Sequence, residues 1–322
     1  MAACLRPALL PLFGLLIFAC QMTQAERASA DDPAEPVTSW KYPPDMPGSR
    51  IEIYKRVGDV SLNAYIFEPQ GHVAADKRPA IVFFFGGGWK GGTPGQFLPH
   101  CQHLAERGMV AISVDYRVKS RHDAWPQDCV EDAKSAIRWV RKNAKRLGVD
   151  PNRIVAGGAS AGGHLAAATA LIKGFKRNSE DTSISSAPNA MVLFNPAVAL
   201  SQVDGLKLVP EDKLDDIKAR TQGRPEEIAP INHVRKGLPP SAIFHGTADP
   251  TVLFASVDEF AKRMTAAGNR CELMPYKDQI HGFFNAGRGK GEARANANRN
   301  YHKTLVQMDA FLESLGDLKP QS

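Results

Sequence analysis

The sequence contains few cysteines. It has five in 322 residues, and two of them, Cys4 and Cys20, lie in an apolar N-terminal stretch. The other three, Cys101, Cys129 and Cys271, are widely spaced. Such an odd and scattered set excludes both a disulfide framework and a zinc-binding motif. One bridge among the three is an alternative, but we predict buried free thiols.

The sequence also lacks a run long enough to cross a membrane. Its longest apolar run, from Ala8 to Ala19, has roughly a dozen residues, whereas a membrane-spanning helix needs about 20. The run follows Arg6 and precedes small residues that suit signal-peptidase cleavage. We therefore predict a signal peptide at residues 1–25, a secreted or periplasmic protein, and no membrane span once the leader is removed. A retained anchor and lipidation at Cys20 are the alternatives.

A strong excess of one charge is absent as well. The 40 basic and 34 acidic residues give a net charge of +6, and we expect no nucleic-acid partner. A basic cluster after position 281 favours an acidic polymer or surface, but the interspersed Glu292 and small residues favour a solvated helix face instead. The cluster consists of Arg288, Lys290, Arg294, Arg299 and Lys303.

What is present is an alternation of strand and helix signals. Residues 26–48 are rich in Pro, Asp, Ala and Ser and predict a flexible lead-in to one domain at 49–318. The alternation predicts a parallel sheet with helices on both faces. A charged interval at about 200–238 interrupts it and is interpreted as an insertion or small lid. Strands are expected at 51–57, 62–67, 80–85, 110–115, 154–156, 190–194, 242–245 and 271–276, and helices at about 95–107, 126–147, 161–172, 252–267 and 293–315.

The strongest local motif is Gly158-x-Ser160-x-Gly162, which lies between a predicted strand and an Ala-rich helix. A strand that turns sharply into a helix leaves no room for side chains two positions either side of the serine. The motif in this context predicts a nucleophilic serine, exposed above the sheet at a helix N-terminus. A tight glycine turn without chemistry is the alternative.

A serine hydroxyl needs a base to take its proton, and that base is usually oriented by a carboxylate. Asp249 and His281 each follow a predicted strand, and the chain order Ser, Asp, His is the one used by this kind of elbow. We therefore predict Ser160 as the nucleophile, His281 as the general base and Asp249 as its partner. His245 and His164 are interpreted as packed or capping histidines.

Upstream, the segment Phe85-Gly86-Gly87-Gly88-Trp89 directly follows an apolar strand. Consecutive glycines leave backbone N–H groups open to a ligand, and acyl transfer needs such donors for the negative oxygen of its intermediate. A flexible hinge is the alternative.

Other chemistries have little support. Asp115 ends a strand and Asp132 lies on a long helix, and both are interpreted as structural ion-pair partners. No His-x-x-x-His pair or clustered carboxylate set is present, so no metal site is expected.

These motifs resemble the esterase and lipase branch of the α/β-hydrolases, which includes the hormone-sensitive-lipase-like enzymes and the bacterial acetylxylan and feruloyl esterases. The resemblance covers residues 50 to 318. It implies an α/β-hydrolase fold, with a mostly parallel eight-stranded sheet and a small insertion before the strand that leads to the acid, and no cofactor. It also implies an oxyanion hole made by Gly87, Gly88 and the N–H of Ala161.

Two positions depart from the family pattern. Phe85 replaces the histidine of the usual His-Gly-Gly-Gly loop, and Ala159 precedes the serine where lipase-like members often carry Asp. These differences favour the carbohydrate-esterase-like members. Trp89 and Trp125 are candidates to line the acyl or sugar side of the cleft, because aromatic faces suit sugar rings and aryl groups; core packing is the alternative for both.

The function expected is that of a secreted serine carboxylesterase, which hydrolyses short acyl esters through an acyl-enzyme. Acetyl or feruloyl esters of plant polysaccharide are candidate substrates. The alternatives are a lipase-like carboxylesterase for longer acyl esters, a prolyl-oligopeptidase-like peptidase, and a binding module without catalysis. The peptidase normally carries a large N-terminal domain, and the binding module has normally lost a triad member, whereas all three are present here.

Overall fold

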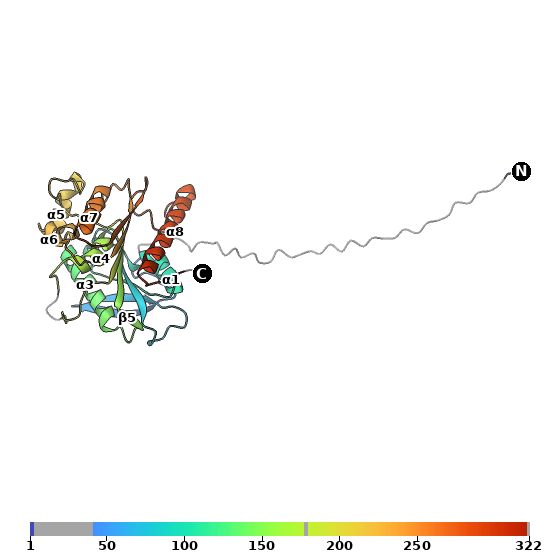
Figure 1. Cartoon of the computed structure of the whole chain (residues 1–322), viewed down its shortest axis with the longest axis horizontal. Helices are drawn as coiled ribbons and strands as arrows, with labels where there is room; N and C mark the ends of the chain where they lie inside the picture. Colours follow the sequence, from blue (N-terminus) through green and yellow to red (C-terminus); the bar gives the residue numbers. More distant parts are fainter. Residues whose placement is uncertain (3–40, 177–179, 321–322) are drawn as a thin grey trace. The chain divides into compact units, whose positions relative to one another are not determined.

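An eight-stranded sheet forms the centre of the computed structural model, which describes residues 1–2, 41–176 and 180–320 (Figure 1). The strand order is β1-β2-β4-β3-β5-β6-β7-β8. β2 runs antiparallel to β1 and β4, and all other neighbours are parallel. The predicted mostly parallel sheet is therefore confirmed. The strands are β1 Arg50–Val57, β2 Val60–Phe67, β3 Arg78–Phe84, β4 Val110–Val114, β5 Val149–Ala159, β6 Ala190–Phe194, β7 Ser241–Gly246 and β8 Cys271–Tyr276.

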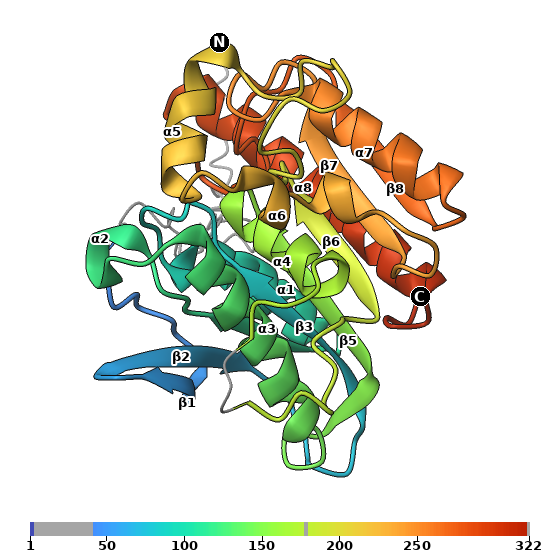
Figure 2. The same cartoon turned by 90° about the vertical axis from the view of Figure 1, so that its left-hand side faces the viewer.

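Helices cover both faces of this sheet, as the alternation predicted. Figure 2 shows β1 and β2 at one edge of the sheet and β8 with its neighbour α7 at the other. The predicted helix at 126–147 ends earlier, at Lys142. The α-helices are α1 Leu98–Glu106, α2 Lys119–His122, α3 Pro126–Lys142, α4 Ala161–Leu171, α5 Leu214–Arg220, α6 Pro225–Ile228, α7 Phe254–Ala266 and α8 Gly291–Ser314.

The central strand β3 explains why both faces must be covered. The side chains from Ala80 to Phe84 alternate between two apolar clusters, and all five are fully buried. Ala80, Val82 and Phe84 pack with residues of α3, α4 and α7. Ile81 and Phe83 pack with residues of α1 and α8. Figure 1 shows these two groups of helices on opposite sides of the sheet.

The insertion joins β6 to β7 and contains α5 and α6. Its helix α5 contacts the glycine-rich loop after β3. Arg220 donates a hydrogen bond from Nη1 to the Gly88 carbonyl oxygen at 3.0 Å, and Asp216 pairs with Lys90 at 3.2 Å. The insertion therefore packs directly on the glycine-rich loop that follows β3.

The described end of the lead-in contacts the domain. Tyr42 donates a hydrogen bond to Asp115 at 3.1 Å, and Met46 is buried in the apolar cluster of α1 and α8. Packed structure thus reaches back to Tyr42. The predicted signal peptide at 1–25, with Cys20 and the lead-in as far as residue 40, lies outside the described residues.

The two aspartates interpreted as ion-pair partners differ. Asp132 accepts from Arg117 Nε at 2.8 Å and from Lys55 Nζ at 2.7 Å, which confirms its prediction. The prediction for Asp115 is wrong: Tyr42 is the side chain that donates to it, and no ion pair among the described residues includes it. Its burial raises the pKa of the Asp115 carboxyl to about 6.

The three cysteines in the described part of the chain are free, as predicted. Cys101 and Cys129 are buried, whereas Cys271 is partly exposed. Within the described ranges, no helix is long and apolar enough to cross a membrane. Nor do the described residues hold a group of three or more His, Cys, Asp or Glu side chains placed to bind a metal ion.

Candidate active site

Ser160 lies in the turn between β5 and α4, with φ of 53° and ψ of −117°. This is a strained conformation for a residue that carries a side chain. The flanking glycines are required by close backbone approach. A Cβ on Gly158 would lie 2.3 Å from the Gly162 carbonyl oxygen, and a Cβ on Gly162 would lie 1.9 Å from the Phe84 carbonyl oxygen. The motif thus forms the sharp elbow that the sequence predicted.

The glycine loop after β3 lies against this elbow. A Cβ on Gly86 would come within 3.4 Å of the Ser160 Cβ atom. The Gly86 N–H is already used, because it donates to Gln96 Oε1 at 2.6 Å. Gly87 and Gly88 both line the cavity above the serine and have φ of 129° and 62°. Their N–H groups are therefore the candidates in this loop for stabilising an oxyanion.

Ala161 supplies the remaining predicted donor. It is the first residue of α4, and the N–H groups of a helix's first turn have no acceptor inside the helix. Ser160 and Ala161 therefore occupy the positive end of the α4 dipole, which favours a negative charge at that point.

The predicted acid and base are hydrogen-bonded. Asp249 Oδ2 accepts from His281 Nδ1 at 2.7 Å, and Oδ1 accepts from the backbone N–H groups of Thr251 and Val252 at 2.8 and 3.0 Å. The Asp249 side chain is buried, whereas that of His281 is 24% exposed. Burial by itself raises the pKa of Asp249, but the bond from His281 and the two backbone N–H groups outweigh it and hold the pKa below its ordinary value. Asp249 thus remains an anion that orients His281.

Asn195 is a residue of this site that the sequence analysis missed. It follows β6 and is fully buried, with φ of 42°. Its Nδ2 donates to Asp249 Oδ2 at 3.1 Å, and its Oδ1 accepts from the Gly282 N–H at 3.2 Å. Asn195 therefore links the acid to the peptide that follows His281. The sequence does place Asn195 directly after an apolar strand, as it does the other site residues, and this position could have marked it as a candidate.

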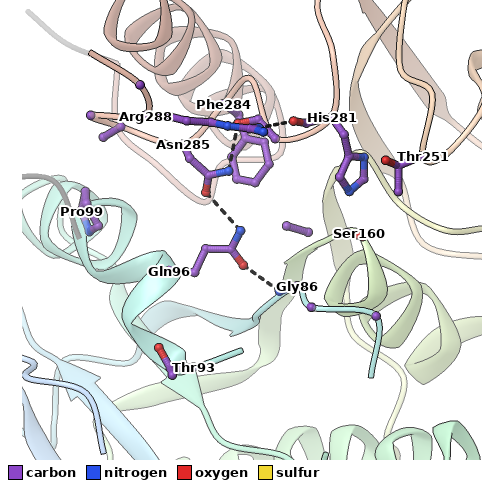
Figure 3. A pocket seen from close by; sticks show the side chains of 17 residues that line it. Gly86, Thr93, Gln96, Pro99, Ser160, Thr251, His281, Phe284, Asn285 and Arg288 are labelled. Carbon is purple, nitrogen blue, oxygen red and sulfur yellow. Dashed lines mark hydrogen bonds between the residues drawn. The ribbon is translucent and has the colours of Figure 1, made fainter. Parts of the chain in front are cut away.

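Gln96 and Asn285 form a second unpredicted link (Figure 3). Gln96 accepts from Gly86 and donates from Nε2 to Asn285 Oδ1 at 3.0 Å. Asn285 in turn donates from Nδ2 to the Gly282 carbonyl oxygen at 2.9 Å. Each amide oxygen here accepts and each amide nitrogen donates, so both side-chain orientations are consistent. The link connects the glycine loop to the loop that carries His281.

Ser160 and His281 line the same cavity, which has a volume of about 700 Å³. In Figure 3 the imidazole of His281 lies above Ser160, with Thr251 on its far side. Among the hydrogen bonds of the described residues, none joins the two side chains, and such bonds often tighten only when substrate binds. Gly87, Gly88 and Phe284 contribute to the wall.

The two competing histidines are packed, as predicted. His164 is fully buried and accepts at Nδ1 from Trp89 Nε1 at 3.3 Å, while its Nε2 lies 2.6 Å from the Ile228 carbonyl oxygen. Burial lowers its pKa to about 4. His245 is also buried, which lowers its pKa, and its Nε2 lies 2.9 Å from the Val252 carbonyl oxygen. Neither side chain lines the cavity.

The prediction that tryptophans line the cleft is corrected by the structure. Trp89 is 5% exposed, and its indole is held edge-on against His164 at a centroid distance of 5.0 Å. Trp125 lies at the start of α3, where the Lys119 ammonium sits 4.7 Å from its ring centroid. Neither residue belongs to the lining of the cavity that holds Ser160. The indole N–H of Trp89 has a buried acceptor in His164, as buried tryptophans usually require.

Comparisons with known proteins agree with this fold. The family model BD-FAE matches residues 66–264, and the dienelactone hydrolase family model matches residues 219–312. Carboxylesterase NlhH of Mycobacterium tuberculosis is 29% identical over 297 residues, which cover 87% of this chain and 90% of that protein.

Solved structures of esterase 2 from Thermogutta terrifontis are similar as well. The form phosphonylated by sarin is 50% identical, with a TM-score of 0.82, and the match covers 87% of this chain and 100% of that chain. The propionate-bound form is 51% identical, with a TM-score of 0.80, over 88% of this chain and 100% of that chain. The fold, the elbow and these relatives together show that the chain belongs to the BD-FAE family of α/β-hydrolases and is a carboxylic ester hydrolase.

Proposed function

We propose that this protein is a secreted serine carboxylesterase that hydrolyses short acyl esters through an acyl-enzyme on Ser160. The observation that carries the proposal is the Asp249–His281 hydrogen bond of 2.7 Å in the cavity that Ser160 also lines. A nucleophile at a strained elbow, a base and an orienting acid are the parts that acyl transfer requires.

Acylation follows from this arrangement. His281 Nε2 takes the proton of the Ser160 hydroxyl as its oxygen attacks the ester carbonyl carbon. The carbonyl oxygen becomes negative and is stabilised by the N–H groups of Gly87, Gly88 and Ala161. The bond to the alcohol oxygen then breaks, the alcohol leaves with the proton from His281, and the acyl group remains on the serine.

Deacylation repeats these steps with water. His281 removes a proton from a water molecule that attacks the acyl-enzyme, and the same N–H groups stabilise the second oxyanion. Collapse of this intermediate returns the proton to Ser160 and releases the acid. Throughout, the Asp249 anion holds the imidazole with its Nδ1–H toward the carboxylate and stabilises the imidazolium.

Short acyl groups are favoured by the solved relatives, since esterase 2 of Thermogutta terrifontis is described in propionate-bound and butyrate-bound forms. The resemblance of the motifs to acetylxylan and feruloyl esterases supports acetyl or feruloyl esters of polysaccharide as natural substrates. The leader predicted at residues 1–25 supports secretion, which would bring the enzyme to polysaccharides outside the cell.

The test uses mature protein and its Ser160→Ala variant with p-nitrophenyl acetate, butyrate and octanoate, together with release of acetate and ferulate from xylan. We expect acetate and butyrate to be preferred, and Ser160→Ala to lose several orders of magnitude in kcat. A fluorophosphonate probe should label the parent protein and not the variant. Ser201→Ala is the matched control, because Ser201 does not line the cavity.

Other results would redirect the assignment. Preference for octanoate would favour the lipase-like alternative. Cleavage of proline-containing peptides without ester turnover would favour the peptidase. Equal rates in the parent and Ser160→Ala proteins would exclude Ser160 as the nucleophile.

A further inference from the structure

The cavity beside Ser160 has an unbalanced charge. Arg288 lines it, and of the described residues in its wall none is Asp or Glu. The acid of the site, Asp249, is buried beneath the histidine and paired with it. An ester entering this cavity therefore meets one guanidinium and no carboxylate.

Arg288 is held close to the reacting groups. Its Nη1 donates to the carbonyl oxygen of His281, and the next N–H in the same peptide, that of Gly282, donates to Asn195. Figure 3 shows the guanidinium extended toward the His281 backbone and across the cavity wall. A guanidinium has five N–H donors, so this contact leaves donors for a ligand. The side chain is exposed, and no ion pair among the described residues involves it.

A second arginine near the glycine loop, Arg220, differs from Arg288 because its charge is paired. Arg220 approaches the opposite part of the site and donates to the Gly88 carbonyl oxygen, but it is paired with Asp216 on its own helix. On the Arg288 side the next basic residues, Lys290 and Arg294, have no carboxylate partner within the described ranges either. Arg288 is therefore the arginine at the cavity whose charge is not offset by an ion pair with a described carboxylate, whereas the charge of Arg220 is.

We infer that the preferred substrates are esters that carry a carboxylate, which Arg288 binds next to the catalytic histidine. This inference rests on the proposed esterase function. The carboxylate belongs either to the acyl part, as in a monoester of a dicarboxylic acid, or to the alcohol part, as in an ester of a uronic acid sugar. Arginine suits this role because its planar fork matches the two oxygens of a carboxylate.

The test compares matched anionic and neutral esters. For the alcohol side the pair is 4-carboxyphenyl acetate and 4-(methoxycarbonyl)phenyl acetate. For the acyl side it is p-nitrophenyl monoglutarate and p-nitrophenyl methyl glutarate. Within each pair we measure the ratio of kcat/KM for the anionic ester to kcat/KM for the neutral one. Comparing this ratio between proteins cancels the intrinsic reactivity of the esters.

Arg288→Gln should lower the ratio roughly fivefold for the ester pair whose carboxylate contacts the guanidinium. A fivefold change corresponds to about 1 kcal/mol, the largest energy usually found for a solvent-exposed ion pair. Arg288→Lys should retain part of the preference, because it keeps the charge without the fork. The effect should shrink as salt is added. Arg299→Gln is the matched control, since Arg299 is an exposed residue of α8 outside the cavity lining.

The outcomes separate this inference from the function on which it rests. Failure to hydrolyse both the anionic and the neutral esters would contradict the proposed function. Hydrolysis of neutral esters with equal ratios in the parent and Arg288→Gln proteins, for both pairs, would overturn the inference alone. An equal fall in Arg299→Gln would overturn it as well, because net charge rather than a site would then set the preference.

Discussion

The two halves of the active site are held in place by different forces. At the elbow, backbone atoms approach so closely that side chains are excluded. A Cβ on Gly162 would lie 1.9 Å from the Phe84 carbonyl oxygen, and one on Gly158 would lie 2.3 Å from the Gly162 carbonyl oxygen. Overlaps of this size with backbone atoms cannot be relieved by a small shift of a side chain, because the backbone itself would have to move.

On the acid–base side, hydrogen bonds between residues far apart in the sequence do the positioning. Asn195 bonds to Asp249, 54 residues away, and to Gly282, 87 residues away. Gln96 bonds to Asn285, 189 residues away, and so joins the glycine loop to the His281 loop. Each bond is worth about 1 kcal/mol. We therefore expect all-or-none effects at the elbow and graded effects on the acid–base side.

The largest effect is expected for Gly162→Ala. The new methyl would collide with the Phe84 carbonyl, so the free energy of unfolding should fall by more than about 3 kcal/mol, or the protein should fail to fold. Denaturant unfolding measures this. Gly91→Ala is the control, because the nearest atom to its Cβ would be Ser120 Oγ at 3.7 Å. Similar unfolding midpoints for the two variants would contradict steric control of the elbow.

Asn195→Gly should impair catalysis without unfolding the protein. Glycine adopts the φ of 42° without strain, so the variant removes the amide alone. Loss of the links to Asp249 and Gly282 should misplace the His281 loop and lower kcat roughly 10- to 100-fold. KM should change little, because Asn195 does not line the cavity. An unchanged kcat would show that the Asp249–His281 pair needs no such support.

Asn195→Asp tests the same contact through pH. A second carboxylate beside Asp249 would disfavour ionisation of both groups and raise the pKa of Asp249. Since the site needs the Asp249 anion, the acid limb of the pH–rate profile should move to higher pH. A variant with lower activity but the same acid limb would point to a purely structural role for Asn195.

The packing beneath the acid–base side contains His100, which is buried among Phe97, Phe194 and Tyr301 at centroid distances of 5.1 to 5.4 Å. Among the described residues, neither of its ring nitrogens has a hydrogen-bond partner. Burial lowers the pKa of His100 from 6.5 to about 3. Between these two pH values His100 is protonated in the unfolded chain but not in the folded chain. The free energy of unfolding is therefore unaffected by His100 above pH 6.5 and falls as the pH is lowered from 6.5 toward 3.

His100→Phe should flatten this dependence. The slope of the unfolding free energy against pH between these values should decrease by up to about 1.4 kcal/mol per pH unit. Denaturant unfolding at several pH values measures the slope. His302→Phe is the control, since His302 is exposed on α8. If the two variants have the same slope as the parent protein, His100 is not the group that responds.

The smallest effect is expected for the link between Gln96 and Asn285. Gln96→Leu and Asn285→Leu should each lower kcat/KM for p-nitrophenyl acetate a few-fold, and the double variant should be little worse than either. A coupling energy of about 1 kcal/mol corresponds to one hydrogen bond within such a pair. Additive losses would show that the two amides act independently. Gln96→Glu refines the result, because it still accepts from Gly86 but cannot donate to Asn285 when ionised.

How much of this structure the sequence predicts depends on how far apart the interacting residues lie along the chain. The strand and helix pattern predicts the order of elements because burial on one or both faces leaves a periodic record in neighbouring residues. The prediction for Trp89 failed because a local pattern does not reveal that His164, 75 positions away, accepts its indole N–H. Asn195 was overlooked for the same reason, since its partners are distant in the sequence.

The amino-acid sequence by itself determined the alternating sheet, the elbow at Ser160 and the order of nucleophile, acid and base, because short-range sterics and chain order specify each of them. Only the tertiary structure decided which amides join Asp249, Gly282 and the glycine loop, and which charge faces the cavity. Those features depend on loops that meet at the carboxyl ends of parallel strands. Contacts of this kind arise from packing across the sheet, and no pattern of neighbouring residues encodes them.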